Sequence, residues 1–208
     1  MKKTLYFLLT GLLISTTVFA QDSTASQKEN DFKNGFRVHG ISYEFGQENL
    51  NFVDKNIFNK PFYEFHELGI DFQLGADKRS VKILSLDLGL VDNNQLGAGY
   101  YAKLEYSVRI KFLKCLYITP QVGLGSGQFF FHDDLVDPDY YETYDAEAEY
   151  PRLFIHTGIS GGIDLKTLLG IPLDVFIARQ RFNEFWSPYS KKDIFSNHSS
   201  TIGLTYRF

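Results

Sequence analysis

Hydrophobic and polar residues alternate with a period of two along most of the chain after residue 35. The longest example is the segment 96–113. One of its faces is apolar and carries Ala98, Tyr100, Ala102, Leu104, Tyr106, Val108, Ile110 and Phe112. The other face carries Gly97, Gly99, Tyr101, Lys103, Glu105, Ser107, Arg109 and Lys111. Successive side chains of a β-strand point to opposite sides, so this period predicts a strand.

Segments with strand character recur through the chain, and about eight of them are predicted. They lie at 36–45, 62–75, 80–91, 96–113, 115–131, 150–166, 171–183 and 199–208. No long amphipathic helix is predicted between them. Short links (76–79, 114 and 167–170) alternate with long ones (46–61, 132–149 and 184–198), and only the short link 92–95 breaks this alternation. The pattern predicts an all-β fold: a single antiparallel up-and-down β-barrel.

The charged face of such a barrel indicates which solvent surrounds it. A Lys or Arg that faces lipid at the bilayer midplane costs about 2–4 kcal/mol. If the apolar face pointed inward, the charged face would be the outer surface, as in a soluble binding barrel of lipocalin type. We expect the reverse, a transmembrane barrel whose apolar face meets lipid and whose charged face lines the lumen. A lipocalin-like periplasmic barrel remains an alternative.

Two segments alternate less regularly. In the first segment, a β-bulge at Gly40 is needed to turn Phe36 and Val38 outward. In the seventh segment both faces are largely apolar. The assignment preferred from the sequence points Phe176, Ala178 and Phe182 outward, and it therefore points Arg179 and Arg181 inward.

The inward faces carry charges of both signs, which are predicted to pair because an unpaired buried charge is costly. The predicted inward acids are Glu44, Glu67, Asp71, Asp87, Glu105 and Asp164. The predicted inward bases are Lys103, Arg109, Lys111, Arg179, Arg181 and Arg207. A lumen this narrow is filled by side chains. We therefore interpret the network as structural and expect no catalytic residue, no cofactor and no open pore.

The two ends of the chain predict export and membrane assembly. Residues 1–20 have two lysines, an apolar stretch and a Val-Phe-Ala end, as a secretory signal peptide has. The polar residues 21–35 are predicted to be a disordered lead-in, and 36–208 the barrel. At the other end the alternation continues through Tyr206 to the terminal Phe208. This ending resembles the C-terminal assembly signal of Gram-negative outer-membrane barrels.

Taken over 36–208, the chain resembles the small outer-membrane barrels of the OmpA-transmembrane and OmpX type. The resemblance is architectural, and it implies an outer-membrane location with both termini in the periplasm and the long loops outside. It implies a monomer whose partners are outer-membrane lipid, lipopolysaccharide and, during biogenesis, the barrel assembly machinery. It also implies a structural or surface-interaction role in the cell envelope.

Composition narrows the remaining function classes. The formal net charge is −4, so no basic surplus indicates nucleic-acid binding. Cys115 is the only cysteine, which excludes an internal disulfide and a cysteine-based metal site. Gly123 to Gly127 superficially resembles a phosphate loop but lacks its Lys-Ser/Thr ending and its strand-to-helix context. Small residues on a crowded inward face explain that run.

Two local features leave other functions open. The segment 132–149 carries eight carboxylates and no Lys or Arg. No metal site is predicted in it, although Asp133, Asp134, Asp137 and Asp139 would be the residues to contact a cation such as calcium. His198 and Ser200 share a face of the last segment, which resembles the His-x-Ser pair of outer-membrane lipid A deacylases. The resemblance covers three residues and has no acidic third member, so a lipid-modifying enzyme is kept as an alternative.

Overall fold

The protein was analysed as a computed structural model, which describes residues 36–49, 62–93, 97–131, 135–136, 143–144, 150–186 and 195–208. Eight long strands form the fold. They are β1 (Arg37–Asn49), β2 (Phe62–Ala76), β3 (Ser80–Asn93), β4 (Gly97–Lys111), β5 (Leu116–Phe131), β8 (Tyr150–Asp164), β9 (Leu173–Trp186) and β10 (Phe195–Arg207). Two short strands, β6 (Leu135–Val136) and β7 (Thr143–Tyr144), pair with each other. Among the described residues, no helix is long and apolar enough to cross a membrane.

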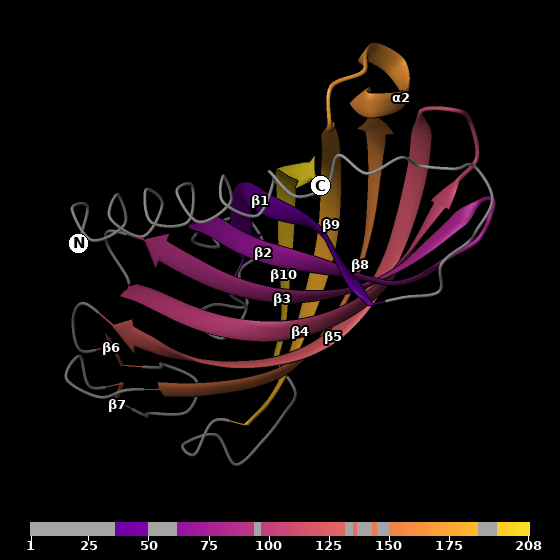
Figure 1. The fold of residues 1–208 in the computed structure, drawn as a ribbon. Helices are drawn as coiled ribbons and strands as arrows, with labels where there is room; N and C mark the ends of the chain where they lie inside the picture. Colours follow the sequence, from indigo (N-terminus) through magenta and orange to yellow (C-terminus); the bar gives the residue numbers. More distant parts are fainter. Residues whose placement is uncertain are drawn as a thin grey trace. The chain divides into compact units, whose positions relative to one another are not determined.

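The eight long strands close into one antiparallel barrel. Its order is β1-β10-β9-β8-β5-β4-β3-β2, so each long strand pairs with its neighbours in the chain and β1 closes on β10 (Figure 1). The predicted all-β, up-and-down, eight-stranded fold is confirmed. The strands are longer than predicted at one end, where β1 continues to Asn49 and β9 to Trp186.

Short links join the strands at one end of the barrel, which we call the turn end. These links are 77–79, 112–115 and 165–172, and the last contains the helix α2 (Leu165–Leu169). The Asp164 side chain accepts a hydrogen bond from the Thr167 N–H and caps this helix. Gly170 ends it at φ 77°, a left-handed conformation that favours glycine. The opposite end, bounded by Asn49, Asn93, Phe131 and Trp186 with the strands that follow them, is called the loop end.

The barrel has apolar side chains outside and polar side chains inside. Outward residues such as Leu88, Leu124 and Ile177 are 60–66% exposed. Inward residues such as Lys103 and Glu105 are 2% and 5% exposed. A soluble barrel shows the opposite distribution, since its apolar side chains leave water by turning inward. The predicted orientation of both faces of 96–113 is confirmed.

The irregular start of the first strand is resolved by a bulge. The register between β1 and β2 shifts between Val38 and Gly40, so His39 is passed over in the pairing. Phe36 and Val38 are both exposed as a result. The bulge predicted at this position is confirmed.

The predicted orientation of β9 is wrong. Phe176, Ala178 and Phe182 are buried in the lumen, whereas Arg179 and Arg181 are exposed on the outer wall. The cause is space inside the barrel. Phe176 lies against Gly203 of β10 so closely that a Cβ on that glycine would be 2.2 Å from the ring. A glycine on one strand thus accommodates an aromatic ring from the next strand. With this ring in the lumen, the inward and outward residues of β9 are exchanged relative to the prediction.

Candidate functional site

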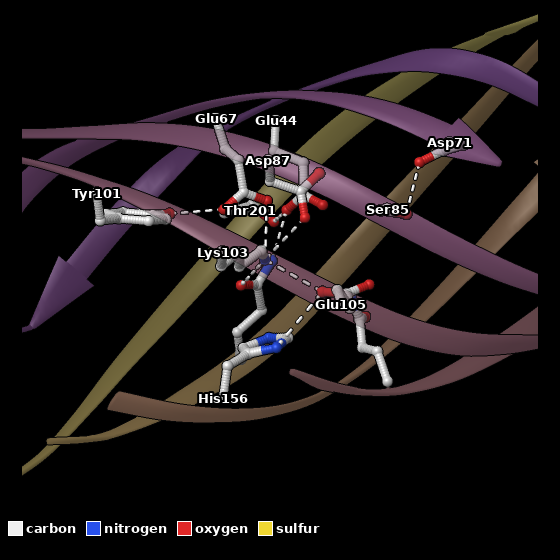
Figure 2. A network of polar contacts seen from close by, with 12 residues as sticks. Glu44, Glu67, Asp71, Ser85, Asp87, Tyr101, Lys103, Glu105, His156 and Thr201 are labelled. Atoms are coloured by element: carbon white, nitrogen blue, oxygen red, sulfur yellow. Dashed lines mark hydrogen bonds and ion pairs between the residues drawn. The ribbon is translucent and has the colours of Figure 1, made fainter. Parts of the chain in front are cut away.

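The centre of the lumen is organised around Lys103 (Figure 2). Its Nζ lies 2.9 Å from Glu67 Oε1, 3.1 Å from Glu105 Oε2 and 3.8 Å from Asp87 Oδ2. All four side chains are almost fully buried, and they come from β2, β3 and β4. Side by side on neighbouring strands, they form an ion cluster that joins three strands from the inside. Tyr101 extends the cluster by donating its OH to Glu67 Oε2 at 2.6 Å.

Neutral donors hold the other buried carboxylates of this region. Glu44 of β1 accepts hydrogen bonds from the Thr201 hydroxyl at 2.6 Å and from Gln180 Nε2 at 2.8 Å. Asp71 accepts one from Ser85 at 2.7 Å. Because these donors come from β3, β9 and β10, the polar network runs round the barrel rather than along one strand.

A second cluster fills the turn end. Arg109 pairs with Asp174, and Arg207 pairs with both Asp164 and Asp174. Lys111 reaches Asp164 at 2.9 Å. The Arg109 guanidinium carbon also lies 4.3 Å from the centre of the Tyr117 ring. Asp164 thus links β4, β10 and the cap of α2, which ties the turn end together.

A third cluster lies towards the loop end. Arg152 of β8 pairs with Glu48 of β1 at 3.0 Å and with Glu184 of β9. Asn197 of β10 also donates to Glu184 at 2.6 Å. Between this cluster and Lys103 lies a layer of aromatic rings with centroids 5.3–6.2 Å apart. Its members are Phe65, Tyr101, Phe154 and Phe182.

Little space is left among the described lumen residues. A cavity of about 40 Å³ lies between Lys103 and the turn end, bordered by Glu44, Asp71, Asp87, Glu105 and Arg109 among others. That is room for one or two water molecules. It is too small for a substrate or cofactor. No group of three or more His, Cys, Asp or Glu side chains in the described part of the chain is arranged to hold a metal ion.

The predicted lumen residues mostly lie where expected, but the charge balance differs. Glu44, Glu67, Asp71, Asp87, Lys103, Glu105, Arg109 and Asp164 are buried in the lumen, with Lys111 and Arg207 at its edge. Sequence reasoning missed Glu48, Arg152, Asp174 and Glu184, all of which are buried. Instead of six acids against six bases, nine described carboxylates face five paired bases. With β9 in its observed orientation, the alternation of its residues places Asp174 and Glu184 in the lumen.

Arg179 and Arg181 do not belong to the lumen network. Both side chains lie on the outer wall, where Arg179 Nη1 donates to Ser200 Oγ at 3.0 Å. Arg181 Nε donates to Ser196 Oγ at 2.6 Å and to Asn183 Oδ1 at 3.0 Å. The structure therefore shows a polar patch on the part of the outer wall that β9 and β10 form.

His198 and Ser200 share this outer face of β10, as the His-x-Ser reading required. The Ser200 hydroxyl accepts its hydrogen bond from an arginine, and no carboxylate faces outward on the described parts of β8, β9 or β10. A catalytic serine needs a base that is itself oriented by a third group. On the described parts of β1, β8, β9 and β10, the strands next to the pair, no carboxylate faces outward to serve as that third group.

The other sequence predictions meet the structure only in part. Tyr206 faces outward at the end of β10, and the Phe208 that follows it is also exposed. The signal peptide at 1–20, the lead-in at 21–35 and the acids Asp133, Asp134, Asp137 and Asp139 lie outside the described residues.

Fold and lumen together define the class of this protein: a closed eight-stranded β-barrel with an apolar outer wall and a charged, filled interior. No protein-family model matches the sequence, and a search of curated proteins finds no relative. Solved structures with a similar fold include Ail, the attachment invasion locus protein of Yersinia pestis, at 13% identity and a TM-score of 0.48. Neisserial surface protein A is similar at 8% identity and a TM-score of 0.49. Each alignment covers 84% of this chain and 99% of the other.

Proposed function

We propose that this protein is an integral outer-membrane barrel with a structural or surface-interaction role, carried by the segments that connect strands at its loop end. The observation that supports this proposal most directly is the reversed polarity of the barrel. Exposed leucines and isoleucines cover the wall, while buried ion clusters fill the lumen. In water such a wall would be an apolar patch far larger than monomeric soluble proteins carry. In a bilayer it is the surface that lipid requires.

Closure of the barrel supports the same environment. A strand in hydrocarbon must satisfy every backbone N–H and C=O within the protein, because no water is available. The pairing of β1 with β10 removes the two edges that an open sheet would expose. The lipocalin-like alternative is not supported, since it would need an apolar interior to bind its ligand.

The filled lumen favours a role other than transport. Three ion clusters and an aromatic layer occupy the interior from the turn end towards the loop end. The lipid A deacylase alternative has the His198–Ser200 pair but no outward acid on the described parts of β1, β8, β9 and β10, the strands next to the pair. The parts left to carry a function outside the bilayer are therefore the connections at the loop end, chiefly 50–61, 132–149 and 187–194.

We further propose that the turn end faces the periplasm and the loop end faces the cell exterior. Outer-membrane barrels have short periplasmic turns and longer outer loops. In this barrel two of the three shortest links, 77–79 and 112–115, lie at the turn end, and the two longest, 50–61 and 132–149, lie at the loop end. Epitope tags inserted in 132–149 and, as the matched control, in 112–115 test the orientation. On intact cells an antibody is expected to bind the first tag and miss the second. The reverse labelling would contradict the orientation.

A further inference from the structure

A polar patch interrupts the apolar wall on β9 and β10. The outward residues of β9 are apolar from Leu173 to Ile177 and polar from Arg179 to Asn183. Those of β10 are apolar from Tyr206 back to Ile202 and polar from Ser200 to Ser196. The two polar runs are adjacent because Arg179 pairs with Ser200 and Arg181 with His198. We call this the wall patch: Arg179, Arg181, Asn183, Ser196, His198 and Ser200.

The register of the barrel gives the depth of the wall patch. A row of paired residues can be followed from strand to strand round the barrel. Because every strand is tilted in the same sense, this row does not close on its starting residue but moves steadily along the barrel axis. The row that starts at Asp92 near the loop end of β3 returns to that strand at Lys82, near the turn end. Arg179 is reached halfway round. It therefore lies near the middle of the wall, with Arg181 and Asn183 progressively closer to the loop end.

Both arginines have hydrogen-bonding capacity left over. A guanidinium has five N–H donors and no acceptor. Arg179 uses Nη1 on Ser200, and Arg181 uses Nε on Ser196 and Asn183. Ser196 pairs with Asn183, one step nearer the loop end than Arg181, so the Arg181 side chain leans in that direction. The Nη groups of Arg181 are left to meet whatever lies beside the wall.

No described residue on the strands next to these arginines supplies a negative charge, and Glu64 of β2, an outward carboxylate in the same row as Arg179, lies three strands away. Every carboxylate on the described parts of β1, β8, β9 and β10 faces the lumen: Glu44, Glu48, Asp164, Asp174 and Glu184. Charged groups on a lipid-facing wall are costly unless they are paired. Within the described residues of these four strands, no carboxylate offsets the two positive charges, which favours an anionic group in the lipid beside the wall as their partner.

From this arrangement we infer that the wall patch binds a phosphate group of the phosphorylated glycolipid in the outer leaflet, lipopolysaccharide. The inference rests on the proposed outer-membrane placement. Arginine matches phosphate in geometry, because its N–H groups form paired, charge-assisted hydrogen bonds. Arg181 and the serines provide the first contact near the loop end, and Arg179 provides a second positive charge deeper in the wall.

A second copy of the chain fits the wall patch less well. A two-fold dimer interface brings the same surface of each copy together. It would set Arg179 and Arg181 of one copy against the same arginines of the other, with no described carboxylate between them. Repulsion of like charges in a low-dielectric layer disfavours that contact. An anionic lipid has the opposite charge and no such penalty.

Native mass spectrometry of the purified, folded barrel tests the inference with bisphosphorylated lipid A as the probe. The test variant carries Arg179→Gln and Arg181→Gln. The matched control carries Arg79→Gln and Lys82→Gln, which remove two exposed positive charges at the turn end. Lipid A binding is expected to fall about tenfold or more in the test variant, as loss of charge-assisted bonds to phosphate implies. The control is expected to bind like the wild type.

Several outcomes would overturn the inference. They are equal binding by the test variant and the wild type, equal binding of dephosphorylated lipid A, equal binding of phosphatidylglycerol, and lipid-free dimers held together by the wall patch. Gel mobility before and after heating is recorded for every variant to show that the barrel is folded. A wild-type protein that does not pellet with outer membranes would contradict the proposed function. A wild-type protein that pellets with outer membranes but gives one of the lipid-binding outcomes above would contradict only the inference about the wall patch.

Discussion

At the scale of single residues, the interior depends on one lysine to an unusual degree. Lys103 is 2% exposed and lies within ion-pair distance of Glu67, Glu105 and Asp87. Breaking a buried ion pair by removing one partner costs about 3–5 kcal/mol, because the other charge is left uncompensated. A substitution that removes the Lys103 charge would leave three buried carboxylates without their shared positive partner.

Lys103→Met keeps the length of the side chain and removes its charge. We expect it to lower the free energy of unfolding by about 3–5 kcal/mol, measured by urea titration of the barrel in lipid vesicles. Lys82→Met, on the exposed face of the neighbouring strand β3, is the matched control and should change stability by less than about 1 kcal/mol. A similar small effect of both substitutions would show that the lysine cluster contributes nothing to stability.

Gly203 in the lumen and Gly161 on the outer face of β8 differ in the space around them, and Gly203 gives the sharper prediction. Its missing Cβ makes room for the Phe176 ring, whereas a Cβ on Gly161 would meet only a backbone oxygen at 3.9 Å. Gly203→Ala is therefore expected to destabilise the barrel by about 1–3 kcal/mol through overpacking, with Gly161→Ala as the tolerated control. The double variant Gly203→Ala with Phe176→Leu should recover much of the loss. Thermal melting of the folded band on a gel provides the measurement, and equal melting of the two single variants would contradict the packing argument.

At the scale of elements, the sequence predicts a strand wherever its two faces differ strongly in polarity. The eight strands and the bulge before Gly40 followed from alternation alone. The orientation of β9 did not, because Val175 and Ile177 alternate with Phe176 and Ala178, so both faces read as apolar. Only the neighbouring strand decides between them, through the space left at Gly203. The short helix α2 and the β6–β7 pair were also missed, since each is too short to show a period.

Site-directed spin labelling tests the corrected orientation of β9. In a Cys115→Ser background, a label at Ile177 should collide readily with oxygen dissolved in the bilayer. A label at Ala178, the next residue, should be shielded because its side chain is 7% exposed and points into the lumen. The account expects this contrast to alternate along the strand. Oxygen access at position 178 equal to or above that at position 177 would restore the orientation inferred from the sequence.

At the scale of the whole molecule, the barrel combines a wall suited to lipid with an interior suited to charge. The sequence predicted this division, and most of the lumen acids and bases, because alternation assigns each residue to a face. It did not predict the excess of acids over bases. That excess depends on donors such as Thr201, Gln180 and Ser85, whose bonds to carboxylates form only once distant strands are adjacent.

Fractionation of cells that express the full chain tests the central claim most directly, because it asks whether the barrel is embedded in the outer membrane. The protein is expected to stay in the outer-membrane pellet after washing with alkaline carbonate. Without heating it should also migrate on a detergent gel at a different position from the heated sample, since a closed barrel keeps its strand hydrogen bonds in detergent. Release into the soluble fraction by carbonate or salt, with a single gel position before and after heating, would contradict the account.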